Sequence, residues 1–212
     1  MNFILSERKI YKKYSLYILN LILFPIKMII PQPIIKKIPY LKTNKDIRLS
    51  LTLQNTTGLL LDIGCGENEL VKEYKLKGGD GIGVDVYDWG TVDLVVKDTS
   101  SLPFKNDKFD TITFIACLNH IPNRIEVLKE AKRILKKDGK IIVTNLTPAI
   151  SYIWHKYAYW DDDQHERGMV EGEVWGFKSK KIEKIFLDAG FEIVLKKKFS
   201  FFLNNYYIIK KK

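Results

Sequence analysis

The sequence predicts an α/β fold built on a mostly parallel, seven-stranded sheet with helices on both faces. Two observations support this class. Strand and helix patterns alternate along residues 43–212, and the first predicted strand, Leu59–Ile63, is an apolar run. Such alternation is typical of parallel sheets, whose central strands are buried on both faces. The 212 residues therefore suit one main domain, residues 43–212, preceded by a distinct segment, residues 1–42.

Apolar runs bounded by turn-forming residues mark the predicted strands. They cover residues 59–63, 81–86, 93–96, 111–117, 140–145, 191–199 and 201–209. Helical periodicity predicts helices over residues 46–54, 68–76, 123–135 and 182–189. In the third helix, Asn123 and Glu126 stand at capping-box spacing, and Gly139 is expected to end the helix. The last two strands follow each other closely enough to form an antiparallel pair.

The N-terminal segment, residues 1–42, has a basic start followed by an apolar stretch, Leu16–Ile30. A bilayer-spanning helix needs about 20 apolar residues, and this stretch is shorter and is interrupted by Pro25 and Lys27. No small-residue cleavage site follows it, so a signal peptide is not expected. Two interpretations remain open: a helix lying on an anionic membrane surface, or a helix packed on the main domain.

The formal net charge is +10, and lysines near the two ends contribute much of it. A basic surface attracts nucleic acid, anionic lipid or acidic substrates, and it also arises from a lysine-rich composition alone. No arginine-rich stretch with interleaved aromatics is present, so nucleic acid is not the expected partner. The two cysteines, Cys65 and Cys117, have no metal-site spacing and fit a reduced compartment. We therefore expect a cytoplasmic protein, at the inner face of the membrane if residues 1–42 bind lipid.

A glycine-containing loop after the first strand predicts a ligand site. Gly64 and Gly66 allow the backbone to turn sharply and approach a ligand closely. About 20 residues further on, the second strand ends in Asp85, which can accept hydrogen bonds from both hydroxyls of a ribose. Glu69 stands where a dinucleotide-binding loop has its third glycine, and Asp62 is badly placed against a pyrophosphate. An adenosine compound carrying an ammonium and a sulfonium fits these residues better.

Four segments in order carry a resemblance to a known family: LLLDIGCGENEL, GIGVDVYD, KDTSSLPFKNDKFDTITF and LNHIPNRIEVLKEAKRILKKDGKIIVTN. The sequence resembles the class I S-adenosylmethionine-dependent methyltransferases, nearest to the group that includes the ubiquinone and menaquinone C-methyltransferases. The resemblance covers about Leu59 to Phe191. It implies a Rossmann-like fold, S-adenosylmethionine as cofactor and methyltransferase activity.

The resemblance also implies cofactor-binding roles for individual residues. These are Asp62, Gly64, Cys65, Gly66, Asp85, Val86, Asp98, Thr99 and Ala116. The loop would hold the methionine portion, with Asp62 near its amino group. Asp85 would hold the ribose, and Val86 would pack on the adenine. Asp98 would accept a hydrogen bond from the adenine amino group, and Thr99 would supply a backbone contact. Ala116 would border the sulfonium.

Two positions depart from the family pattern. Asn68 stands where members often have glycine, which would shift the cofactor loop slightly. Asn119 stands where an acidic residue is common before the histidine. The second departure leaves the substrate side less closely matched than the cofactor side.

Candidate catalytic residues concentrate in a loop between the fifth strand and the next helix, residues 154–177. Loops at the carboxyl ends of parallel strands line the ligand crevice of such folds. His165 and Glu166 are candidate acid and base, and Arg167 is a candidate ligand for a carboxylate or phosphate. His120 is a second candidate base. The alternatives are a solvated loop, and a histidine that only shapes its turn.

The same loop offers possible ligands for a hard cation, Asp161–Asp163 with His165. Consecutive acids on a loop usually face water, so no metal site is predicted. The expected function is methyl transfer to oxygen or carbon of a small or lipid-linked metabolite. One alternative, a nucleic-acid methyltransferase, lacks an Asn-Pro-Pro-Tyr-like or catalytic-cysteine motif. The other, a non-catalytic cofactor- or partner-binding protein, fits poorly with an intact glycine loop.

Overall fold

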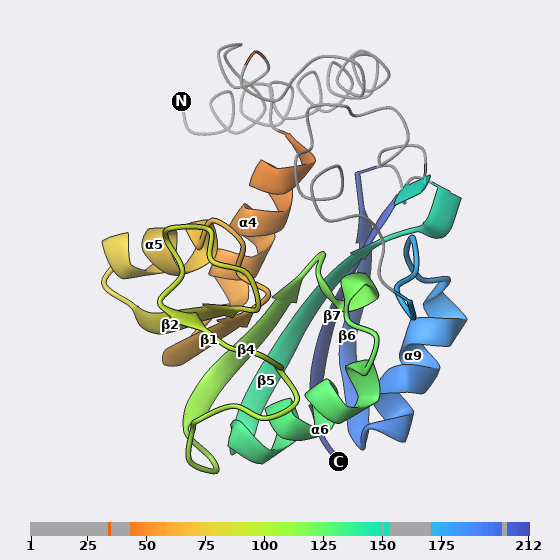
Figure 1. Ribbon diagram of the computed structural model, residues 1–212. Helices are drawn as coiled ribbons and strands as arrows, with labels where there is room; N and C mark the ends of the chain where they lie inside the picture. Colours follow the sequence, from red (N-terminus) through yellow and green to blue (C-terminus); the bar gives the residue numbers. More distant parts are fainter. Residues whose placement is uncertain (1–33, 35–42, 150, 153–170, 201–202) are drawn as a thin grey trace, which may run out of the picture.

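The computed structural model describes residues 34, 43–149, 151–152, 171–200 and 203–212. In this part of the chain one seven-stranded sheet has the strand order β3-β2-β1-β4-β5-β7-β6 (Figure 1). Strands β3, β2, β1, β4 and β5 run parallel to one another, whereas β7 is antiparallel to both β5 and β6. The predicted fold class is confirmed.

The bounds of the elements follow the predicted ranges closely. The strands are β1 (Leu59–Ile63), β2 (Asp80–Asp85), β3 (Leu94–Val95), β4 (Phe109–Ile115), β5 (Leu135–Leu146), β6 (Phe191–Phe199) and β7 (Asn204–Lys211). The helices are α4 (Asn44–Asn55), α5 (Glu69–Leu76), the 3₁₀ helix Leu118–His120, α6 (Arg124–Ile134) and α9 (Ser179–Asp188).

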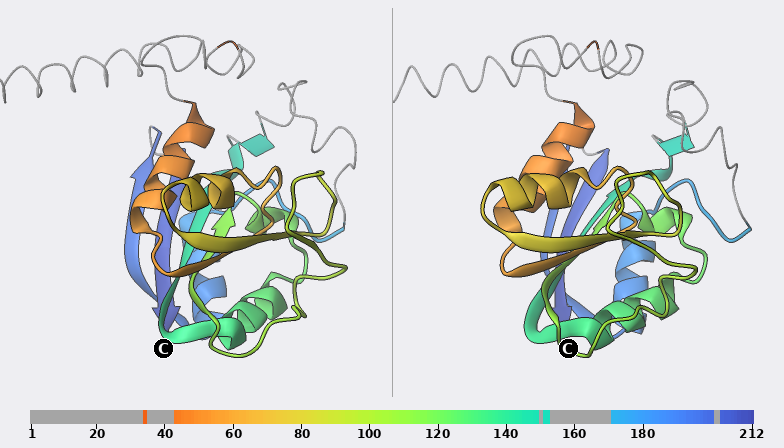
Figure 2. Two further views of the ribbon diagram at one scale, coloured as in Figure 1. Left: turned by 90° about the vertical axis from the view of Figure 1, so that its left-hand side faces the viewer. Right: turned by 60° about the vertical axis from the view of Figure 1, so that its left-hand side comes forward.

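Helices cover both faces of the sheet (Figure 2). On one face Leu60 of β1 packs against α5 and α4, through residues such as Leu70 and Leu53. On the other face Leu61 and Ile63 belong to the main core, to which α6 and α9 contribute. Side chains of a strand alternate between faces, so β1 is buried on both sides, as expected of a central parallel strand.

The end of α6 differs from the prediction. The helix stops at Ile134 and β5 begins at once with Leu135, which pairs with Phe109 of β4. Gly139 therefore lies inside β5, at the point where the pairing register shifts, and does not end the helix. The predicted capping box is also wrong, because the Asn123 side chain makes no cap and donates to Asp98 instead. Pairing with β4 overrides the local helix signal.

The calls on residues 1–42, a membrane-lying or a packed helix, fall outside the described residues apart from Ile34. In the part of the chain that is described, no helix has the length and apolar character needed to cross a membrane.

Helix α4 begins with a complete capping box. The Thr43 hydroxyl accepts from the Asp46 amide at 3.0 Å, and the Asp46 carboxylate accepts from the Thr43 amide at 2.8 Å. We expect Thr43→Ala to lower the free energy of unfolding by about 1 kcal/mol, measured by urea denaturation. Ser50→Ala, in the middle of the same helix, is the control and is expected to change it by less than about 0.5 kcal/mol. Equal losses in both variants would contradict a specific role for the cap.

Candidate functional site

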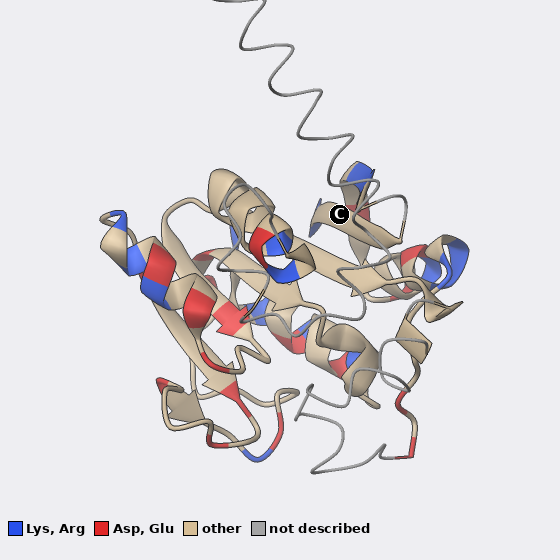
Figure 3. Ribbon diagram, turned by 90° about the horizontal axis from the view of Figure 1, so that it is seen from above, with Lys and Arg blue, Asp and Glu red and all other residues tan. Residues whose placement is uncertain are grey.

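A pocket of about 410 Å³ opens at the carboxyl ends of β1, β2 and β4. Eight of the nine predicted cofactor residues line it, the exception being Asp98, and so does His120. Helix α4 contributes Lys45, Arg48 and Leu49 to the wall. Acidic and basic residues are interspersed around this edge of the sheet (Figure 3). A pocket of this size is typical of small-molecule sites.

The glycine loop after β1 is fixed by backbone contacts with β2. The amides of Gly64 and Cys65 donate to the Val84 carbonyl at 2.9 and 3.2 Å. Gly64 has a φ of +71°, and a Cβ there would lie 2.7 Å from the Cβ of Cys117. Gly66 also has a positive φ, +52°, but a Cβ there would meet open space. The first glycine is therefore required by packing, and the second leaves a bare backbone that a ligand can approach.

Asp85 joins the loop to the end of β2. One carboxylate oxygen accepts from the Gly66 amide at 2.9 Å, and the other accepts from the Tyr87 amide at 3.1 Å. Each carboxylate oxygen has a further lone pair. Asp85 can therefore order the loop and still accept hydrogen bonds from ligand hydroxyls.

Asp62 is buried on the floor of the pocket. Its carboxylate accepts a hydrogen bond of 2.6 Å from the Thr113 hydroxyl of β4. Burial raises the pKa of Asp62 to about 7; the Thr113 hydrogen bond opposes this shift, and the charge of Asp85 adds to it. A cationic group placed in the pocket would favour the ionised form of Asp62. The site is therefore suited to a ligand that carries positive charge.

Asn68 holds the far end of the loop. It has a φ of +59° and precedes α5, which explains why an asparagine can replace the glycine common in the family. Its amide nitrogen donates to the Thr91 carbonyl and to the Asp93 carboxylate, both at 3.0 Å. The side chain fills the space above Gly83, where a Cβ would lie 2.1 Å from the Asn68 amide oxygen. The substitution therefore ties the loop to the segment between β2 and β3.

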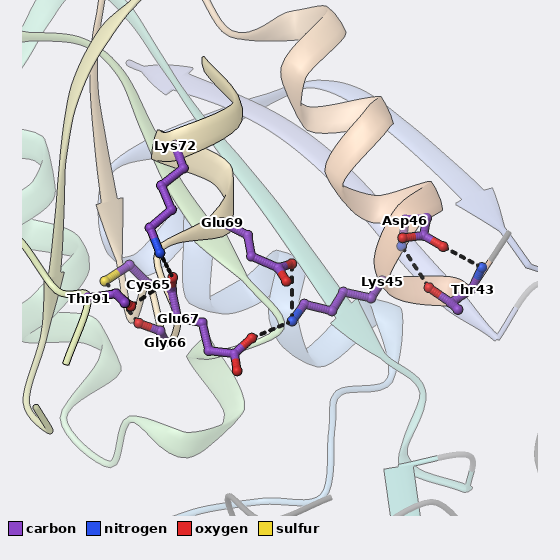
Figure 4. A network of polar contacts seen from close by, with 9 residues as sticks. All are labelled: Thr43, Lys45, Asp46, Cys65, Gly66, Glu67, Glu69, Lys72 and Thr91. Atoms are coloured by element: carbon purple, nitrogen blue, oxygen red, sulfur yellow. Dashed lines mark hydrogen bonds and ion pairs between the residues drawn. The ribbon is translucent and has the colours of Figure 1, made fainter. Parts of the chain in front are cut away.

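Two ion pairs of Lys45 connect α4 to the glycine loop and the start of α5 (Figure 4). The Lys45 ammonium lies 3.1 Å from both the Glu67 and the Glu69 carboxylates. Burial lowers the pKa of Lys45, but hydrogen bonds and charges from the two glutamates outweigh this and raise it. The Glu67 carbonyl also accepts from the Thr91 hydroxyl and the Lys72 ammonium. The sequence pattern did not predict this contact, which closes one side of the pocket.

The side of the pocket next to Asp85 is aromatic. Val86 and Tyr87 are about half exposed at its rim, and the Tyr87 and Trp89 rings lie 4.8 Å apart with an edge-on geometry. Thr99 is buried and lines the pocket. The Asp98 carboxylate instead accepts hydrogen bonds from the Ser100 hydroxyl, from the Ser100 amide at 2.8 Å and from Asn123. These hydrogen bonds, the hydroxyl's above all, lower the pKa of Asp98.

The opposite side of the pocket is bordered by the end of β4. Ala116 has a φ of +55°, and its amide donates to the Thr144 carbonyl at 3.0 Å. Beyond it lie Cys117 and His120, whose Nδ1 is 3.4 Å from a carboxylate oxygen of Glu173. Glu173 lies within the loop of residues 154–177, where the sequence predicted catalytic residues. Nothing in the sequence distinguishes it from the other acidic residues of that loop.

The other catalytic candidates, His165, Glu166 and Arg167, lie outside the described residues, as does Asp161–Asp163. Over the residues that are described, no group of three or more His, Cys, Asp or Glu side chains has the arrangement of a metal site.

Comparison with known proteins decides the family. A family model described as a methyltransferase domain matches residues 38–196. The chain belongs to this methyltransferase family. Every residue that lines the pocket described above lies within the matched range.

The methyltransferase has relatives of known name and structure. It is 25% identical over 138 residues to a ubiquinone/menaquinone biosynthesis C-methyltransferase of Pseudomonas fluorescens, covering 58% of this chain and 54% of that protein. It is 26% identical over 169 residues to a demethylmenaquinone methyltransferase of Staphylococcus saprophyticus, covering 66% and 72%. A crystal structure of an S-adenosylmethionine-dependent methyltransferase from Methanosarcina mazei has a TM-score of 0.55 at 22% identity, covering 76% and 96%. The chain spans about half the length of the first curated relatives it matches.

We expect the raised pKa of Asp62 to make binding of a cationic ligand depend on pH. With a pKa of about 7, Asp62 would be mostly neutral at about pH 6 and would attract an ammonium group less strongly. We expect the affinity for S-adenosylhomocysteine, measured by calorimetry, to fall roughly five- to tenfold from about pH 7.5 to about pH 6. Asp62→Asn should bind more weakly and show no such change. An unchanged pH dependence in that variant would assign the effect to another group.

Proposed function

We propose that this methyltransferase transfers a methyl group to oxygen or carbon of a small or lipid-linked metabolite. The observation that carries the proposal is the lining of the pocket, in which apolar residues such as Leu49, Ala116 and Ile121 accompany His120 and a few charged groups. A recessed, largely apolar space with a few polar groups is typical of sites for small acceptors. Residues 43–212 would form the catalytic domain and residues 1–42 a separate segment.

The bound cofactor supplies a methyl group that its sulfonium already activates. The residues of the chain would then bind and orient. Asp62 would face the ammonium, the bare backbone at Gly64–Gly66 would lie along the methionine portion, and Asp85 would accept from the ribose hydroxyls. In-line positioning of the acceptor supplies much of the rate in such a reaction.

Three further residues would complete the cofactor site. Val86 would pack against the adenine, Thr99 would contact its edge, and Ala116 would border the sulfonium, since all three line the pocket. The adenine contact of Asp98 stays a prediction. Its carboxylate is engaged with Ser100 and Asn123 and would have to reach the ligand from that position.

The distribution of charge favours a small acceptor over nucleic acid. Residues 43–152 include every lining residue of the pocket and carry 15 basic and 15 acidic side chains. The basic excess lies instead in residues 1–42, with 8 basic and 1 acidic, and in residues 171–212, with 10 basic and 5 acidic. Nucleic-acid sites need a basic surface around the reacting centre, which this balance does not provide.

The same distribution supports a lipid-linked acceptor. Basic residues next to an apolar stretch favour an anionic membrane surface, to which each adds up to about 1 kcal/mol. One relative is named a ubiquinone/menaquinone biosynthesis C-methyltransferase, and another is named a demethylmenaquinone methyltransferase. The enzyme would then act in the cytoplasm, docked at the inner face of the membrane through residues 1–42.

Transfer of labelled methyl from S-adenosylmethionine to cell extract, separated into lipid, soluble and nucleic-acid fractions, tests the proposal. We expect label in the lipid or soluble fraction. Label confined to nucleic acid would overturn the proposed acceptor class, and no label from protein that binds the cofactor would overturn catalysis of this kind.

Asp85→Asn provides the matched variant for that assay. Loss of the charged acceptor should lower cofactor affinity roughly 10- to 100-fold, because hydrogen bonds to charged groups contribute about 1.5–3 kcal/mol. Asp88→Asn, an exposed acid three residues further on, should bind and transfer normally. Equal loss in both variants would show that the effect is not specific to the ribose position.

A further inference from the structure

The stretch Glu171–Phe177 is tied to the turn that follows β4. Arg124 donates to the Gly172 carbonyl at 2.7 Å, and the Val174 amide donates to the Asn119 carbonyl at 3.0 Å. Gly172 has a φ of +91°, and a Cβ there would lie 2.9 Å from Pro122. These contacts join parts of the chain about 50 residues apart. They direct the residue between Gly172 and Val174, which is Glu173, inward.

Glu173 is a buried carboxylate, with a side chain that is 1% exposed. One oxygen lies 3.4 Å from Nδ1 of His120, and its charge also acts on Arg124, opposing the lowering of the Arg124 pKa by burial. A buried carboxylate needs such partners, because an unpaired charge in the interior is costly. The pair is therefore built into the wall of the methyltransferase pocket.

The contacts of His120 favour one assignment of its ring proton. Nε2 lies 2.9 Å from the side-chain nitrogen of Asn119, and with the amide in this orientation the nitrogen donates and Nε2 accepts. Nδ1 then carries the hydrogen and donates to Glu173. The imidazole lines the cofactor pocket, and its side chain is 14% exposed. An acidic residue at position 119 would instead accept from Nε2 and keep it protonated.

The geometry points to Glu173 as the positioning residue for His120 as base, and to a phenolic hydroxyl as the group that is methylated. This inference rests on the proposed function and narrows it to O-methylation. A hydroxyl must lose its proton, whereas an amine already presents a lone pair. A phenol, with a pKa of about 10, is acidic enough to yield its proton to a neutral imidazole.

In the proposed transfer the acceptor hydroxyl would replace the Asn119 amide at Nε2 and transfer its proton there. An oxygen lone pair would form the bond to the methyl carbon, and the bond from that carbon to sulfur would break, leaving its electron pair on sulfur. The Glu173 carboxylate would stabilise the imidazolium through its contact with Nδ1. The other charged residues that line the pocket with His120 are Lys45, Arg48, Asp62, Glu67, Glu69 and Asp85, and Arg124 interacts with Glu173.

The first test identifies the bond that is made. Label transferred to cell extract by the full chain is treated with boron tribromide, which cleaves aryl methyl ethers and leaves methyl groups on carbon. Release of the label is the expected result. Retention of the label on carbon would overturn the inference while leaving methyl transfer intact, and absence of any transfer would overturn the proposed function itself.

The second test separates positioning from folding. Glu173→Gln should lower kcat roughly 100-fold at about pH 7 and less than tenfold at about pH 9.5, because the acceptor then ionises without help. Asn119→Asp should move the acid limb of the rate profile to higher pH. Glu171→Gln, an exposed neighbour, is the control. A loss in Glu173→Gln that is equal at every pH would assign Glu173 a merely structural role.

A third measurement does not depend on turnover. The chain has three histidines, so the ring nitrogens of His120 can be assigned by NMR with a His120→Asn variant. We expect His120 of the wild type to carry its proton on Nδ1, and Glu173→Gln to shift the proton toward Nε2. A proton on Nε2 in the wild type would overturn the assignment of this nitrogen as base.

Discussion

The hydrogen bond between the Gly66 amide and the Asp85 carboxylate joins the two halves of the cofactor site. It connects the loop after β1 to the end of β2, two strands already aligned through the pairing of Ile63 with Val84. Because the loop amides of Gly64 and Cys65 also bond to β2, the backbone around Gly66 has few alternatives. A bare, rigid backbone segment results, which reduces the ordering cost of ligand binding.

This arrangement concentrates negative charge, and the charge has a chemical consequence. Asp62 and Asp85, after burial, raise the pKa of both Cys65 and Cys117, so these thiols stay protonated at neutral pH. A thiolate is the nucleophilic form of cysteine. Both thiols line the pocket, and burial, more than the two carboxylates, keeps them in the less reactive protonated form.

Local patterns allowed most of the fold to be predicted, and the family resemblance pointed to many of the residues that line the pocket. The bounds of β1 and β6 agree with prediction to the residue, since apolar content and turn residues define both ends. Contacts between distant parts of the chain were not predictable from such patterns. The end of α6 depends on pairing of Leu135 with β4. The ion pair between Lys45 and Glu67 joins α4 to the glycine loop, about 20 residues away.

The acceptor side depends on long-range contacts to a greater extent than the cofactor side. His120 lies in a short 3₁₀ helix, but its partner Glu173 comes from a stretch about 50 residues away that is held by hydrogen bonds to Arg124 and Asn119. These contacts fix the stretch Glu171–Phe177. The excess of basic charge lies in residues 1–42 and 171–212, outside the balanced region that lines the pocket. The residues that line the pocket come instead from α4, from the ends of β1, β2 and β4 and the segments that follow them, and from Thr99, so changes within residues 1–42 and 171–212 leave this lining intact.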